Sequence, residues 1–170
     1  MCDAGVVRAV SRHRAPFDAV VLAVTVLAAA PVGVVVAVCV ARAVADPADA
    51  PALVIAAAVG ALLATTWATS ARAYRLEPGR LVVERPAGEI VYPLAGLVEA
   101  RPYGRLGLAI RLGNGGLFGI SGWYWSRELG WFRVHARKVG GAVLLRWPDR
   151  AVVVMPEEPE GFVADVARFR

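Results

Sequence analysis

The amino-acid sequence predicts a two-helix transmembrane hairpin followed by an all-β barrel or sandwich of about seven antiparallel strands, closed by a C-terminal capping helix. Three observations predict this fold class. Two long uncharged runs stand near the N-terminus, with a short polar turn between them. Short alternating segments separated by turn residues fill the middle of the chain. An amphipathic segment ends it, after a stretch rich in proline and glutamate.

The first uncharged run covers residues 19–41, and the second covers residues 50–71. At about 1.5 Å of rise per residue, each run is long enough as a helix to cross a hydrocarbon core of about 30 Å. Lipid offers the backbone no hydrogen-bonding partner, so segments of this length cross only as helices. A helix packed in a soluble core would carry a polar face, but neither run holds a charged side chain. Residues 42–49 are therefore expected to form an extracytoplasmic turn between two transmembrane helices.

Arginine residues lie unevenly around the two runs. Residues 1–18 form a basic N-terminal segment, and Arg72, Arg75 and Arg80 follow the second run, whereas the turn holds one arginine and two aspartates. Because cytoplasmic flanks carry the excess of arginine, both termini are predicted to be cytoplasmic. The alternative is a secretory signal cleaved after residues 43–45 (AVA). The length of the first run argues against it, because the apolar region of a signal has about 7 to 15 residues.

Small residues recur along both runs at every fourth position, and such stripes let helix backbones approach closely. They are predicted to pack the hairpin, or to pack it against another membrane protein or a second copy in a homo-oligomer. No acidic or basic side chain lies inside either run, which argues against an ion path or a proton relay. The predicted transmembrane packing residues are Ala29, Gly33, Ala37, Ala56, Gly60 and Ala64.

From residue 73 onward the periodicity is that of β-strands, and residues 73–170 are predicted to form one domain. Pro78-Gly79 has the residue order of a tight turn, and similar turn residues divide the following segments. Apolar residues at 132, 134 and 136 are predicted to face the core. Arg133, His135 and Arg137 alternate with them and are predicted to face solvent.

The last segment is predicted to be a helix. Two prolines and three glutamates at residues 156–160 are typical of a helix start, because proline suits the first helical position and acids suit the positive end of the helix dipole. Phe162, Val163, Val166 and Phe169 then form an apolar stripe at helical spacing. This stripe is expected to cap the open end of the β domain.

This order of strands followed by one helix is that of pleckstrin-homology-like (PH-like) domains. Residues 113–119 (GNGGLFG), 122–125 (GWYW), 129–132 (LGWF) and 154–162 (VMPEEPEGF) resemble small bacterial membrane proteins with a PH-like domain. The resemblance covers residues 73–168. It implies a transmembrane hairpin that carries a cytoplasmic PH-like module on the bacterial inner membrane. The resemblance implies a binding function and no particular reaction.

A basic segment with interleaved aromatic residues is the candidate binding surface. Its arginines and lysine suit anionic headgroups, and its aromatic residues suit the membrane interface, so it is a candidate surface for anionic lipid or for a protein partner. The alternative is that the aromatic residues cover the end of the barrel and the basic residues only solvate its strands. The candidate residues are Arg101, Arg105, Trp123, Tyr124, Trp125, Arg127, Arg133, Arg137 and Lys138.

No pattern in the sequence indicates catalysis. His13 and His135 stand in unrelated contexts, and nothing resembles a phosphate loop, a metal site or a nucleic-acid motif. We therefore expect no catalytic residue, no metal, no cofactor and no nucleic-acid partner. The sequence favours a non-enzymatic binding or scaffold module held on the membrane. The alternative is a structural or accessory subunit of a larger membrane complex, assembled through the transmembrane helices.

Overall fold

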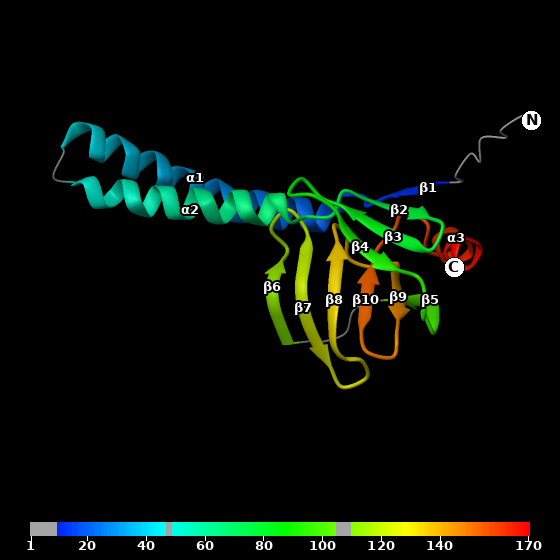
Figure 1. Ribbon diagram of the computed structural model, residues 1–170. Helices are drawn as coiled ribbons and strands as arrows, with labels where there is room; N and C mark the ends of the chain where they lie inside the picture. The colour runs from blue at the N-terminus through cyan, green and yellow to red at the C-terminus, as the bar shows by residue number, and fades with distance from the viewer. Residues whose placement is uncertain (1–9, 47–48, 105–109) are drawn as a thin grey trace, which may run out of the picture.

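The computed structural model describes residues 10–46, 49–104 and 110–170 (Figure 1). Two long helices, α1 (Ala19–Ala45) and α2 (Ala50–Ala68), lie side by side in opposite directions and extend away from a domain of two β-sheets. A third helix, α3 (Pro159–Phe169), lies at the end of the β domain far from the hairpin. The predicted fold class, a helical hairpin followed by a PH-like β domain with a C-terminal helix, is confirmed.

The two long helices are apolar over their whole length. The most apolar 18-residue window has a mean hydropathy of 2.6 in α1 and 1.8 in α2, and only 11% and 6% of these windows are buried. Core helices of soluble proteins are mostly buried, so these helices differ from them. Both helices are long and apolar enough to cross a membrane.

Helix α1 runs past the predicted end at residue 41, and α2 stops before the predicted end at residue 71. The early stop has a local cause. The hydroxyl of Thr69 donates to the carbonyl of Thr65 at 2.9 Å, and the hydroxyl of Ser70 donates to the carbonyl of Trp67 at 2.8 Å. These hydroxyls add a second hydrogen bond to carbonyls of the last turn that also accept from the backbone amides of Thr69 and Ser70.

The predicted small-residue stripes are only partly used within one chain. Ala56 is 7% exposed and is the one buried residue of α2. A Cβ added at Gly33 or Gly60 would meet no atom within 4 Å in the described part of the chain. The two glycines therefore do not bring α1 and α2 together, and their contact with another helix stays a prediction.

The first sheet has four antiparallel strands in the order β1-β2-β3-β4. Residues 78–79 form the predicted turn between the second and third strands, and Gly79 has a positive φ of 76° there. The first strand comes from the N-terminal basic segment and pairs with a strand about 60 residues later, which the sequence analysis did not predict. The strands are β1 (Ser11–Arg14), β2 (Ala73–Glu77), β3 (Arg80–Glu84) and β4 (Ile90–Pro93).

The second sheet has six strands in the order β5-β9-β10-β8-β7-β6. It departs from the expected antiparallel pattern at one place, because β10 runs parallel to β8. With the first sheet this makes ten strands in the described ranges, against about seven expected. The strands are β5 (Glu99–Gly104), β6 (Ile110–Gly115), β7 (Ile120–Ser126), β8 (Gly130–Ala136), β9 (Ala142–Arg146) and β10 (Ala151–Val154).

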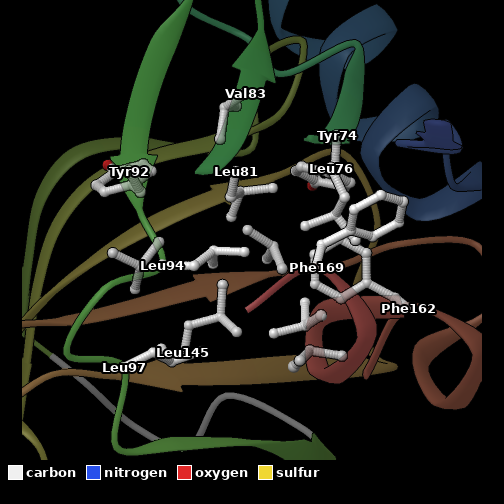
Figure 2. Packing of buried hydrophobic residues seen from close by; sticks show 14 of the residues in the cluster. Tyr74, Leu76, Leu81, Val83, Tyr92, Leu94, Leu97, Leu145, Phe162 and Phe169 are labelled. Atoms are coloured by element: carbon white, nitrogen blue, oxygen red, sulfur yellow. The ribbon is translucent and has the colours of Figure 1, made fainter. Parts of the chain in front are cut away.

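The main hydrophobic core lies between the two sheets and α3. Figure 2 shows Phe162 and Phe169 of α3 packed against Leu76 and Leu81 of the first sheet, as the apolar stripe predicts. A second cluster, which includes Phe132, lies on the other face of the six-stranded sheet. Both faces of this sheet are therefore buried over its central strands.

The hairpin is tied to the β domain at two points of α1. The carboxylate of Asp18 accepts hydrogen bonds from the amides of Val20 at 3.3 Å and Val139 at 3.1 Å, so it caps α1 and holds the turn after β8. These bonds lower the pKa of Asp18, Val139 contributing most. About two turns further on, the hydroxyl of Thr25 lies 2.9 Å from the amide of Phe118 and 3.3 Å from the carbonyl of Gly116. The loop between β6 and β7 is thereby fixed against the helix.

Candidate functional site

The predicted basic and aromatic residues do not form one continuous surface. Arg101 on β5 pairs with Glu99 at 2.5 Å and with Glu128 at 3.4 Å. Strands β9, β10 and β8 separate β5 from β7 in the sheet, so the Glu128 contact shows that the sheet curls. Arg127 is exposed in the β7–β8 turn beside this contact. Arg105 lies outside the described residues.

The three predicted aromatic residues alternate along β7. Trp123 is 45% exposed, whereas Tyr124 is 2% exposed and packs in the second core cluster. Trp125, at the end of β7 toward the β7–β8 turn, is partly buried. The structure thus places only Trp123 prominently on the surface, where the guanidinium of Arg133 stacks on its ring at 5.1 Å.

The prediction that Arg133, His135 and Arg137 face solvent is wrong for His135, which is 2% exposed. This face of β8 lies under the first sheet and the base of the hairpin. The hydroxyl of Tyr92 on β4 lies 2.8 Å from Nε2 of His135. The guanidinium of Arg137 is half-buried over the ring of Phe17 at 4.3 Å. Burial and the charge of Arg72 lower the pKa of Arg137.

Lys138 lies beyond the end of β8, away from the exposed arginines. Its Nζ lies 3.4 Å from the carbonyl oxygen of Glu157, in the segment that leads into α3. Among the predicted residues with described side chains, Arg133 and Trp123 are in direct contact.

A pocket of about 270 Å³, lined by polar residues and glycines, lies where the hairpin meets the β domain. We name it the hairpin-base pocket. The last turns of α2 form one wall, strands β6 and β7 form another, and Arg85 reaches it from the segment after β3. The side chains that matter most here are Thr65, Thr66, Thr69, Arg85, Arg133 and His135. Of the described residues that line this pocket, none is acidic.

The positive charge of the pocket is visible in the titration of His135. Burial, together with the smaller effects of the charges of Arg133 and Arg85, lowers the pKa of His135 to about 3. The imidazole is therefore neutral at pH 7. Among the described residues, its Nδ1 has no hydrogen-bond partner, and the buried Nε of Arg133 has none either.

The sequence analysis missed Arg85 and the three threonines of the hairpin-base pocket. One signal was present, because residues 65–70 (TTWATS) place four hydroxyl side chains at one end of an otherwise apolar run. No local sequence pattern indicates the role of Arg85, because its position beside α2 follows from the folding of the first sheet.

The structure also brings together Ser11, His13 and Asp165, which the sequence analysis left unrelated. The hydroxyl of Ser11 donates to Oδ2 of Asp165 at 2.5 Å, and Nε2 of His13 lies 3.0 Å from the same oxygen. The Ser11 hydroxyl is also 3.2 Å from that Nε2. A catalytic triad requires the serine and the acid to contact opposite ring nitrogens, whereas both contact Nε2 here. The cluster therefore joins β1 to α3 and is not arranged as a proton relay.

The described residues contain no group of three or more histidine, cysteine or acidic side chains placed to hold a metal ion. A larger pocket of about 540 Å³ lies near the start of α3, and glycines, prolines and three glutamates supply most of its lining.

A comparison with protein-family models matches residues 72–169 to the bacterial PH domain. The chain belongs to this family. The matched range agrees with the predicted resemblance and covers the two sheets from β2 onward together with α3. PH domains are generally non-catalytic binding modules. Neither the search of curated proteins nor the search of solved structures found a match.

Proposed function

We propose that this bacterial PH domain protein is a non-enzymatic binding module held on the inner membrane. In this proposal α1 and α2 span the bilayer, and both termini and the β domain are cytoplasmic. The ligand is anionic lipid or a protein partner at the membrane surface. The observation that carries the proposal is the attachment of the domain through Asp18 and Thr25, which holds its basic pocket at the base of an apolar hairpin.

The charge distribution along the hairpin supports the orientation. Arg72 and Arg85 lie at the hairpin base, next to the β domain. At the opposite end, Arg42 pairs with Asp49 at 3.0 Å, so the turn presents little positive charge. Because cytoplasmic flanks carry the excess of positive charge, the base is assigned to the cytoplasmic side.

A second candidate function is a structural or accessory subunit of a larger membrane complex. The open space beside Gly33 and Gly60 favours it, because a helix of another protein can approach closely at such positions. In that case the transmembrane helices make the specific contact, and the β domain only supports them.

Two variants of the full chain separate these functions. In the first, Arg101, Arg127, Arg133 and Lys138 are all replaced by Gln. In the second, Gly33 and Gly60 are replaced by Leu. Each is purified from bacterial membranes in mild detergent, and native mass spectrometry records which lipid or protein stays bound in fixed stoichiometry. The proposed function predicts that the first variant loses the bound species and the second keeps it. Loss in the glycine variant alone would contradict it and support the alternative.

A further inference from the structure

The hairpin-base pocket holds two buried polar nitrogen atoms that the described part of the protein does not use internally. The Nε of Arg133 and the Nδ1 of His135 are buried and have no partner among the described residues. Both residues stand on the same face of β8 and line the pocket. Buried polar atoms in folded proteins nearly always have a partner, so two such atoms in one pocket indicate a site for an external group.

The chemistry of these donors suits an anion. Arg85 and Arg133 supply positive charge, and no described lining residue supplies a compensating carboxylate. When the Tyr92 hydroxyl donates to Nε2 of His135, the neutral imidazole carries its proton on Nδ1 and can donate it. Guanidinium groups bind phosphate oxygens through paired hydrogen bonds, whereas the hydroxyls of Thr65, Thr66 and Thr69 already donate to carbonyls of α2. A phosphate group matches this set of donors.

The position of the pocket selects the source of the phosphate. Thr65, Thr66 and Thr69 belong to the last turns of α2, so one wall of the pocket is the end of an apolar helix. Two apolar side chains lie beside it on paired positions of β6 and β7: Leu112 is 62% exposed, and Trp123 is 45% exposed. A headgroup can thus enter the pocket while its acyl chains remain along the hairpin.

We propose that the hairpin-base pocket binds the phosphate of an anionic phospholipid from the leaflet next to the β domain. This inference rests on the proposed membrane-held binding function and names its ligand and site. Arg133 and Arg85 contact the phosphate oxygens, His135 donates through Nδ1, and Trp123 holds Arg133 in place by stacking.

Thermal unfolding of the full chain in lipid nanodiscs tests the proposal. A ligand that binds only the folded state raises the unfolding temperature. Nanodiscs of phosphatidylcholine alone are compared with nanodiscs that also contain phosphatidylglycerol. We expect phosphatidylglycerol to raise the unfolding temperature of the wild type, and we expect this shift to be lost in Arg85→Gln and in Arg133→Gln. The matched control Arg146→Gln, which removes an exposed arginine at the end of β9 and outside the pocket, should keep the shift. The difference between the two lipids is the readout, so a variant with lower basal stability still tests the proposal.

Three outcomes would overturn the proposal. The first is a shift that persists in both pocket variants, and the second is a shift lost equally in Arg146→Gln, which would indicate general surface attraction. The third concerns the source of the phosphate. Inorganic phosphate added to phosphatidylcholine nanodiscs should not reproduce the shift, and an equal shift would assign the pocket to a free ion. The membrane-held binding function survives these outcomes if the four-residue Gln variant still loses its bound species.

Discussion

The hydroxyl of Tyr92 lies 2.8 Å from Nε2 of His135 and joins β4 of the first sheet to β8 of the second. The two rings are tilted, with centroids 5.9 Å apart. This contact keeps a histidine buried and neutral between the sheets, beside two arginines that disfavour its protonation. The stability of the domain therefore depends on pH through one identified group.

Stability is expected to fall as the pH is lowered from 6.5. The ordinary pKa of histidine is 6.5, and burial lowers the pKa of His135 to about 3 in the folded chain. Between these values the unfolded chain binds a proton that the folded chain does not, so acid favours unfolding. The free energy of unfolding should fall by about 1.4 kcal/mol per pH unit from this group. Urea unfolding in phosphatidylcholine nanodiscs at pH 7 and pH 5 measures this fall in the free energy of unfolding. His135→Gln should show a shallower pH dependence, and equal slopes would contradict the assignment.

Replacing Thr25 by Val should loosen the loop between β6 and β7. Valine matches the shape of threonine but removes the hydroxyl that contacts the amide of Phe118 and the carbonyl of Gly116. Phe118 has a positive φ of 58°, a conformation that needs support from its surroundings. We expect a loss of about 1 to 3 kcal/mol, because the partly buried amide of Phe118 loses its acceptor. Hydrogen exchange at the Phe118 amide should accelerate. Thr25→Ser keeps the hydroxyl and should retain most of the protection.

Gly122→Ala should destabilise the sheet at the β6–β7 pair. A Cβ at Gly122 would lie 2.7 Å from the carbonyl oxygen of Leu112 and 2.8 Å from Cα of Gly113, and its φ is 138°. Overpacking of this kind costs about 1 to 3 kcal/mol. The control is Gly161→Ala in α3, where the nearest atom is 3.4 Å away and φ is not positive. The control should be neutral or stabilising, because alanine favours a helix. Equal unfolding midpoints for the two variants would refute the steric argument.

Phe162→Ala should strongly destabilise the β domain. The ring is fully buried, lies 6.0 Å from the ring of Tyr74, and packs in the core that α3 closes. Truncating a buried phenylalanine costs about 3 to 5 kcal/mol. Ala167→Ser on the exposed face of the same helix should change stability by less than about 0.5 kcal/mol. Urea unfolding followed by tryptophan fluorescence compares them, and a small effect of Phe162→Ala would show that α3 does not stabilise the core.

The helices and several turns follow from residues close together in the sequence. The uncharged runs predict both long helices, because length and the absence of charge are local properties. Pro78-Gly79 predicts its turn, because glycine accepts the positive φ that the turn requires. The apolar stripe of α3 predicts its buried face, on which Phe162, Val166 and Phe169 are buried.

The environment of β8 depends on distant parts of the chain. The alternation of apolar and polar residues correctly places Phe132 and His135 on opposite faces of β8. It does not indicate that the face of His135 is also buried. The cover comes from Tyr92 on another sheet and from the base of the hairpin, 43 or more residues away along the chain. Strand β1 is a similar case, because its pairing with β2 joins residues on either side of the hairpin.

In the candidate site, too, some features follow from the sequence and others arise only on folding. The charge and aromatic content of residues 101–138 predict a basic surface, and Arg133 and Trp123 belong to both that prediction and the pocket region. Arg85 and the threonines of α2 join them only after folding. Composition and periodicity are sums over neighbouring residues, so they specify the helices and the faces of strands. A binding pocket is an arrangement of residues from separate elements, and contacts over long sequence separations create it.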